Sequence, residues 1–175
     1  VNSRVGKANA KGEWVASWGS LGSGPGQFDT PHGIAVSPKD EVYVADRGNR
    51  RIQVFDTEGK FLRQFTIDVP VDLKRGKITY GVESPNAKTG SQAPGAPDAL
   101  CMTPGPNPVL FVGDLYPSRV YKVSLEGKLL GVYGQPGRNP GEFGWIHAIA
   151  CPSEDEIYVG ELINWRVQKL VTKKR

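Results

Sequence analysis

The sequence has no long apolar run, few cysteines and histidines, and none of the short motifs that identify common enzymes. No window of about 18 apolar residues occurs, so we expect no membrane-spanning helix. There is no Ser-His-Asp arrangement with nucleophile-elbow spacing, no phosphate-binding loop and no Cys-x-x-Cys pair. These absences argue against the hydrolases, nucleotide-binding enzymes and dithiol redox proteins that such motifs identify.

The two cysteines are Cys101 and Cys151. Each lies in an apolar run that we assign to an innermost strand, and Cys151 comes one position after the repeat equivalent of Cys101. Because side chains alternate between the faces of a strand, we expect two buried, free thiols that point to opposite faces. Free thiols do not indicate in which cellular compartment the protein is located.

Charge of one sign is not concentrated along the chain. The net charge is +4, and lysines and arginines are scattered among acids. The basic cluster at 173–175 is explained by a solvated terminus. This pattern gives little support to a nucleic-acid partner.

The chain begins at Val1 without an initiator methionine, and it begins in the middle of a repeat. We interpret it as a fragment of a longer protein. The absence of a signal peptide is then uninformative.

Glycine and proline are abundant, with 22 and 14 residues, which suits many short strands joined by turns. The stretch 18–65 contains four short apolar runs, and its pattern returns farther along the chain, where His147 falls on His32 and 157–161 falls on 42–46. A repeat of roughly 40–50 residues with four apolar runs is typical of a β-propeller blade. We therefore predict an all-β propeller.

The repeats divide a single partial propeller domain, residues 1–175, into five parts. These are a half blade, a complete blade, a long inserted loop, a diverged blade and a three-stranded blade, at 1–18, 19–65, 66–97, 98–133 and 134–171. The insert has one strand candidate, 77–82, and its length is typical of a functional or disordered loop.

The pattern predicts about thirteen strands, or about three four-stranded blades, whereas a closed ring needs at least about four blades. One chain would leave an open arc with exposed sheet faces. We expect missing residues or a partner chain to close the ring, and two such arcs would form a six-bladed homodimer.

Residues present in every copy are interpreted as structural. Asp46, Asp114 and Glu161 end the second strand of their blades, where a carboxylate can accept hydrogen bonds from the backbone of the next turn. The same interpretation applies to the recurring arginines and to the aromatic residues of the outer strands, which are Arg51, Arg119, Arg166, Trp18, Phe65 and Tyr133.

His32, Asp98 and His147 share one repeat position, just before the inner strand. Inner strands line the central channel of a propeller, so these side chains should converge near one of its mouths. Two imidazoles and a carboxylate form a suitable set of metal ligands. The alternative is three polar loop residues that bond to the backbone.

Arg47 has leucines, Leu115 and Leu162, at its repeat equivalents, so the repeat itself does not require arginine there. A fixed guanidinium beside a metal suits a ligand that carries a carboxylate. The alternative is a surface ion pair with Asp46 or Glu41.

The pattern Pro-x-Gly-Ile-Ala-Val followed by Val-Tyr-Val-Ala-Asp-Arg-x-Asn-x-Arg-Ile-Gln-Val-Phe resembles the NHL repeat, over nearly the whole chain apart from 66–97. Within that family, Thr-Pro-His-Gly-Ile-Ala-Val at 30–36 and Ala-Asp-Arg-Gly-Asn-Arg-Arg-Ile-Gln at 45–53 are similar to the peptidyl-α-hydroxyglycine α-amidating lyases and their bacterial relatives. Those enzymes are six-bladed propellers that split a peptidyl-hydroxyglycine into a peptide amide and glyoxylate.

The resemblance implies a channel zinc held by three histidines, of which His32 and His147 match two, and a substrate-holding arginine that Arg47 matches. It also implies a tyrosine just before an Asn-Ser-Arg motif. Residues 2–4 match that motif, but the tyrosine and the third histidine would precede Val1.

The family also has a structural calcium that uses an acid after the last histidine, where this chain has Ala148. Calcium is therefore a weaker expectation than zinc, and Asp98 is a candidate substitute ligand. A secreted or periplasmic location is favoured by the resemblance alone.

Three functions are consistent with these features. The first is a partial lyase-type metal site for a small peptide-like or carboxylate ligand. The second is a non-catalytic NHL module that binds a protein, peptide or glycan. The third is RNA binding, for which Lys74, Arg75 and Lys77 give the only local support.

Overall fold

The computed structural model describes residues 2–72, 74, 90 and 93–172, and the structural statements below concern these residues. The predicted strand 77–82, together with Arg75 and Lys77, lies outside them. The described part of the chain is all-β, and no helix in it is long and apolar enough to cross a membrane.

The strands form two four-stranded antiparallel sheets, one three-stranded sheet and two strand pairs. They are β1 (Val5–Ala8), β2 (Trp14–Trp18), β3 (Ser20–Leu21), β4 (Gln27–Phe28), β5 (Pro31–Val36), β6 (Val42–Asp46), β7 (Arg51–Phe55), β8 (Phe61–Phe65), β9 (Pro97–Met102), β10 (Leu110–Asp114), β11 (Val120–Val123), β12 (Leu129–Tyr133), β13 (Ile146–Ser153), β14 (Glu156–Glu161) and β15 (Arg166–Val171).

Each large sheet follows chain order because short hairpins join its strands. Sheets β5–β8 and β9–β12 are complete blades, β13–β15 is a three-stranded blade, and β1–β2 is a half blade. The short parallel pair β3–β4 was not expected from the sequence. The hairpin between β7 and β8 shows the expected turn chemistry, since the Asp56 carboxylate accepts the N–H groups of Glu58 and Lys60, and Gly59 has a φ of 85°.

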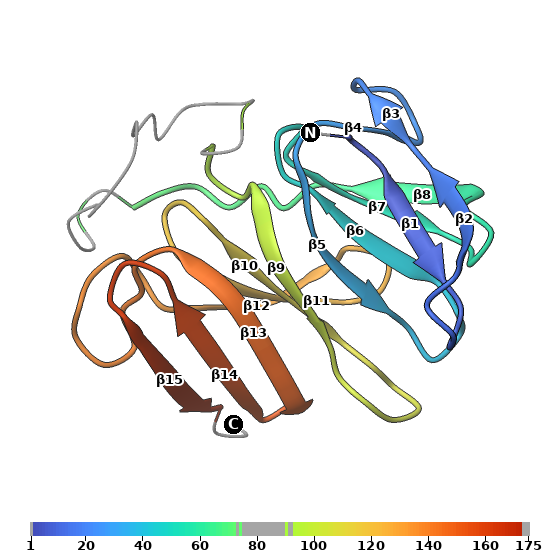
Figure 1. Ribbon diagram of the computed structural model, residues 1–175. Helices are drawn as coiled ribbons and strands as arrows, with labels where there is room; N and C mark the ends of the chain where they lie inside the picture. Colours follow the sequence, from blue (N-terminus) through green and yellow to red (C-terminus); the bar gives the residue numbers. More distant parts are fainter. Residues whose placement is uncertain (1, 73, 75–89, 91–92, 173–175) are drawn as a thin grey trace.

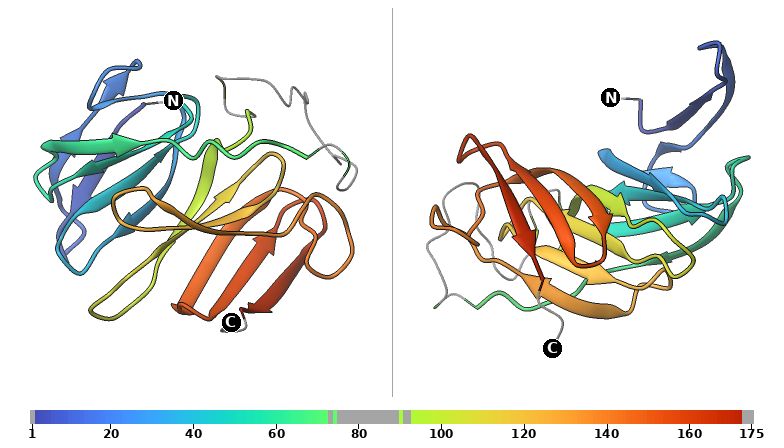
Figure 2. Two further views of the ribbon diagram at one scale, coloured as in Figure 1. Left: turned by 180° about the vertical axis from the view of Figure 1, so that it is seen from behind. Right: turned by 90° about the horizontal axis from the view of Figure 1, so that it is seen from below.

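The blades are arranged side by side around their first strands (Figure 1). β9 contacts β5 on one side and β13 on the other, so these three are the innermost strands of neighbouring blades. Viewed from below, the sheets follow an open arc (Figure 2). The all-β propeller fold predicted from the repeat is confirmed.

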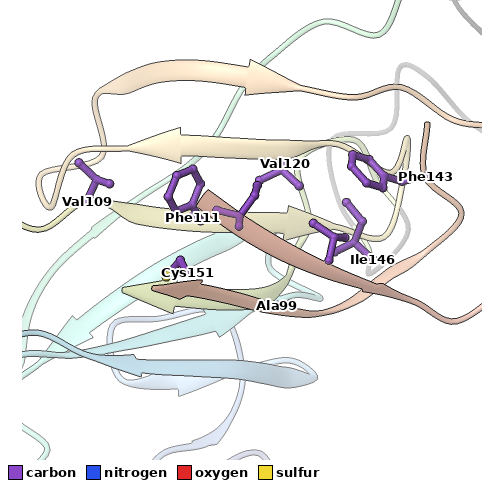
Figure 3. Close-up of a cluster of buried hydrophobic side chains, with 9 residues drawn as sticks. Ala99, Val109, Phe111, Val120, Phe143, Ile146 and Cys151 are labelled. Carbon is purple, nitrogen blue, oxygen red and sulfur yellow. The ribbon is translucent and has the colours of Figure 1, made fainter. Parts of the chain in front are cut away.

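Three apolar clusters lie between successive blades. In the last of them, Phe111 and Val120 of one blade pack with Ile146 and Cys151 of the next (Figure 3). Because successive side chains of a strand point to opposite faces, each central blade contributes to the cluster on either side of it. Apolar burial thus stabilises the order of the blades as well as each sheet.

The aromatic residues of the outer strands pack against a turn glycine of the next blade. A Cβ on Gly59 would lie 2.6 Å from the Trp18 ring, and Phe65 covers Gly127 in the same way. The predicted packing role is confirmed for Trp18 and Phe65, and it explains why these turn positions must be glycine. Tyr133 packs within its own blade, against Phe111.

The carboxylate that ends each second strand fixes the loop entering its own blade. Asp46 accepts hydrogen bonds from the Asp29 N–H and from Arg51, whose guanidinium also donates to the Gly24 carbonyl. Glu161 accepts hydrogen bonds from the Gly144 N–H and from its own arginine. The predicted structural roles are confirmed, but the predicted partner is correct only for Asp114, which accepts the N–H of Arg119 in the following turn.

Two of these carboxyl groups differ in pKa. Burial raises the pKa of Asp114, and the opposing effect of Arg119, whose Nε lies 4.0 Å away, does not cancel it. Burial also acts to raise the pKa of Glu161, but hydrogen bonds, first from Arg166 with its Nε at 2.7 Å, outweigh burial and lower it. The balance between burial and the hydrogen bonds to each carboxylate therefore sets the direction of its pKa shift.

The cysteine prediction was wrong, because Cys101 of β9 and Cys151 of β13 form a disulfide. Their Cα atoms lie 5.9 Å apart across neighbouring innermost strands, a usual separation for a disulfide. Strict alternation had placed the thiols on opposite faces. That placement was right, but one face of each blade packs against the opposite face of the next, so the two side chains meet. Cys101 of β9 and Cys151 of β13 accordingly lie in the same apolar cluster between the two blades.

Candidate functional site

The candidate site lies where the innermost strands of three blades begin. His32 is on β5, Asp98 on β9 and His147 on β13, and each falls within a break in the regular pairing of its strand. A β-bulge bends the strand and re-aims a side chain, and such bulges are common beside functional sites. The sequence predicted that these residues converge, and the structure brings them together.

Close approach of β5 and β9 depends on the glycine after His32. A Cβ on Gly33 would lie 2.6 Å from the carbonyl oxygen of Asp98 and 3.0 Å from the backbone nitrogen of Leu100. Any larger residue would push the two strands apart. Gly33 therefore allows the imidazole of His32 to reach Asp98.

The carboxylate of Asp98 is fully buried and lies within 3 Å of nitrogen atoms of three side chains. Its Oδ1 lies 2.9 Å from His32 Nδ1 and 2.8 Å from Arg47 Nη1. Its Oδ2 accepts a 2.9 Å hydrogen bond from the indole Nε1 of Trp145. Asp98 therefore connects residues of three blades, and neither of its oxygens is left without a donor.

His32 is held through one nitrogen. Its Nδ1 lies within reach of two acceptors, the carboxylate and the backbone carbonyl of Asp98, the latter at 3.0 Å. Nδ1 therefore carries the proton and donates. In the neutral imidazole the lone pair then sits on Nε2, the arrangement seen in histidines that bind metals.

The rings of His32 and His147 lie close together, with centroids 5.3 Å apart and planes at 81°. Zinc bound about 2.0–2.1 Å from a nitrogen of each ring, with tetrahedral angles, would place the two centroids about 5 Å apart. The spacing of the rings fits shared coordination. His147 also lines an open cavity of about 470 Å³ with Leu162 and Trp165.

The predicted ligand set is only partly assembled. Within the described residues, no group of three or more histidine, cysteine, aspartate or glutamate side chains is arranged to hold a metal ion. The two imidazole rings lie edge to face, whereas the Asp98 carboxylate lies 2.9 Å from Nδ1 of His32.

Arg47 follows β6 and is mostly buried, with 14% of its side chain exposed. The alternative that it pairs with Asp46 or Glu41 is wrong, since Asp46 pairs with Arg51 and Glu41 with Arg63. Arg47 pairs with Asp98 of the next blade, and its buried Nε has no hydrogen-bond partner. The guanidinium is thus anchored at one end and retains a free donor.

Sequence reasoning missed Trp145. It precedes β13 with a φ of 53°, the same value as Thr30 at the equivalent position before β5, and its N–H donates to the Ser118 hydroxyl. A tryptophan in this left-handed conformation is uncommon. The signal was present, because Trp145 replaces Thr30 in the repeat, and differences between copies are where function is expected.

Comparison with known proteins gives a family and a fold. The NHL repeat family matches residues 28–55. Peptidylglycine alpha-amidating monooxygenase of Rattus norvegicus is 30% identical over 167 residues, 91% of this chain and 15% of the rat protein. Protein brain tumor of Drosophila melanogaster is 48% identical over 48 residues, 27% of this chain and 5% of that protein.

Among solved structures, virginiamycin B lyase from Staphylococcus aureus matches with a TM-score of 0.56 and 15% identity, over 99% of this chain and 50% of that chain. At this identity the likeness concerns the fold alone. The chain spans only a small part of the length of the curated relatives above, which leaves the activities of those whole proteins open for it.

Proposed function

Since this chain is an NHL-type β-propeller related to peptidylglycine alpha-amidating monooxygenase, we propose that it carries part of a zinc-dependent site of the amidating-lyase type. In this proposal His32 and His147 bind the metal, and Arg47 holds a carboxylate of the substrate. The observation that carries it is the close approach of the two imidazole rings near an anchored arginine.

The two histidines suit a metal for separate reasons. The 5.3 Å spacing of their rings fits ligands that share one ion. The Asp98 acceptors keep the proton of His32 on Nδ1, so that Nε2 is available. A bound zinc ion would act as a Lewis acid toward a substrate oxygen. The resemblance also calls for a third histidine and a tyrosine, which other residues would have to supply.

Arg47 suits the recognition of a small peptide-like or carboxylate ligand. Guanidinium groups bind carboxylates through paired donors. Asp98 holds Nη1 and so fixes the plane of the group, while the buried Nε remains without a partner. Calcium has less support, because Ala148 offers no ligand atom after His147.

Self-association or further blades would complete the ring. Val167 is 70% exposed on the last blade, whereas its repeat equivalents Ile52 and Val120 are 1% and 0% exposed beneath the next blade. Trp165 is 91% exposed, and its equivalent Arg50 is 8% exposed. The exposed face of the last blade therefore carries side chains that, in the other blades, are buried between neighbouring blades. We propose that a second copy of the chain covers this face.

A secreted or periplasmic location is also proposed. The Cys101–Cys151 disulfide supports it, because disulfides persist in oxidising compartments and are rare in the cytosol.

The alternative is a non-catalytic NHL module that binds a protein, peptide or glycan. The similarity to protein brain tumor over 48 residues is the observation in its favour. Fold alone does not decide between an enzyme and a binding module.

Metal content decides between the two functions. Elemental analysis of the purified protein is compared with His32→Ala, His147→Ala and, as a control in an exposed hairpin turn, Glu126→Ala. Zinc near one per chain or per dimer, lost in both histidine variants and kept in the control, supports the metal site. It then justifies an assay of glyoxylate release from a peptidyl-hydroxyglycine. No metal in a folded wild-type protein contradicts it.

A further inference from the structure

We propose that Asp98 is the positioning residue of this site: it holds His32, Arg47 and Trp145 in one fixed arrangement and takes no direct part in binding the metal. This inference rests on the proposed function and assigns a role that the repeat pattern alone did not. The three donors reach Asp98 from residues on both sides of its own blade.

The first support is the saturation of the carboxylate. Oδ1 accepts a hydrogen bond from Arg47 Nη1 and lies 2.9 Å from His32 Nδ1, which also bonds the backbone carbonyl of Asp98. Oδ2 accepts a hydrogen bond from the indole of Trp145, and the side chain is 0% exposed. A direct metal ligand would need one of these lone pairs to face an open position. A buried carboxylate is retained only when it is paired and hydrogen-bonded, and here the partners are the functional groups themselves.

The second support is the position of Asp98 in the repeat. Blades on either side place a histidine at this position, and the blade between them places a carboxylate. That carboxylate lies beside Nδ1 of one imidazole. Metal-binding histidines are commonly oriented in this way, by a carboxylate at the ring nitrogen that does not bind the metal. The central blade thus supplies the orienting acid for a ligand on its neighbour.

The third support is the link to the substrate side. Arg47 and His32 share the same oxygen of Asp98, so the imidazole and the guanidinium keep a fixed separation. Well-oriented groups lose less freedom when a ligand binds. One residue thereby sets the geometry of both the proposed metal ligand and the proposed carboxylate clamp.

The test is Asp98→Asn, which keeps the shape and replaces one acceptor by an NH₂ donor. Whichever oxygen is replaced, the new donor meets either Trp145, or His32 and Arg47. Glu41→Gln is the matched control, because it changes another carboxylate that pairs with an arginine, Arg63, and leaves the bonds around Asp98 in place. Zinc affinity is measured by competition with a chelator, and side-chain N–H exchange and the His32 tautomer are measured by NMR on the metal-free protein.

We expect the Nδ1–H tautomer of His32 in the wild-type protein and slow exchange of the Arg47 guanidinium. Asp98→Asn should speed that exchange and weaken zinc binding by about 10–100-fold, whereas Glu41→Gln should leave zinc binding near wild type. A purely structural role would lower the stability of both variants and leave the zinc affinity of both unchanged, which would overturn the proposal.

Two further outcomes remain informative. If Asp98→Asn does not fold, an Nε2–H tautomer of His32 or fast exchange of Arg47 in the wild-type protein still overturns the inference. If the wild-type protein binds no zinc, the proposed function fails, and the tautomer and exchange data decide separately whether Asp98 positions these groups.

Discussion

Replacing Gly59 by alanine should separate the cost of packing between blades from the cost of backbone strain. Gly59 lies in the β7–β8 turn with a φ of 85°, and an added Cβ would meet the Trp18 ring at 2.6 and 2.7 Å. Gly12 occupies the equivalent turn of the half blade with a φ of 82°, and its Cβ would have no atom within 4 Å. The two substitutions share the strain, and only one creates a clash.

The magnitudes follow from these contacts. The left-handed conformation should cost each alanine about 1 kcal/mol. Overpacking against the rigid indole should add about 1–3 kcal/mol at Gly59. Gly59→Ala is therefore expected to be less stable than Gly12→Ala by at least about 1 kcal/mol.

Urea denaturation, followed by tryptophan fluorescence, measures the free energy of unfolding of both variants. The dependence of that free energy on urea concentration is compared with the wild-type value for each variant. Equal losses of stability in Gly59→Ala and Gly12→Ala would refute the idea that the outer aromatic residue of one blade requires a glycine in the next.

Three further predictions follow from the disulfide, the buried carboxylate and the exposed face. Replacing both Cys101 and Cys151 by alanine should cost about 4 kcal/mol, because the bond joins residues 50 apart, and two thiols reacting in unreduced, denatured wild-type protein would contradict the bond. Glu161→Gln should lose about 1–3 kcal/mol at pH 7 by leaving buried donors unpaired. Because the pKa of Glu161 is lowered, its stabilisation is full above the ordinary carboxyl pKa of 4.5 and disappears as the pH falls through the lowered value, so denaturation at acid pH should show a smaller difference. Trp165→Asp should abolish self-association in light scattering, and a wild-type protein that stays a stable monomer at micromolar concentration would contradict the dimer.

The site depends on features that also hold the blades together. Asp98 and Cys101 lie on β9, and His147 and Cys151 lie on β13, so the disulfide joins the two strands that carry the candidate residues. Gly33 brings β5 against β9 at the same level. Substitutions that loosen the packing of these strands should therefore weaken the site without touching it.

The repeat in the sequence was sufficient to predict the blades and the meeting of three of the candidate residues. Residues at one repeat position take the same place in successive blades, so the convergence of His32, Asp98 and His147 needed no coordinates. The same logic identified the carboxylates that end the second strands and the aromatic residues that cover a turn.

Only the tertiary structure decided what each residue contacts. The pairing irregularities at His32, Asp98 and His147 re-aim their side chains, and a bulge is not visible in a periodic pattern. The packing of one face of β9 against the opposite face of β13 joined two expected thiols in a disulfide. Arg47 and Trp145 bond Asp98 across the boundaries between blades. The packing between sheets sets those distances, and the alternation of side chains along a strand does not predict that packing.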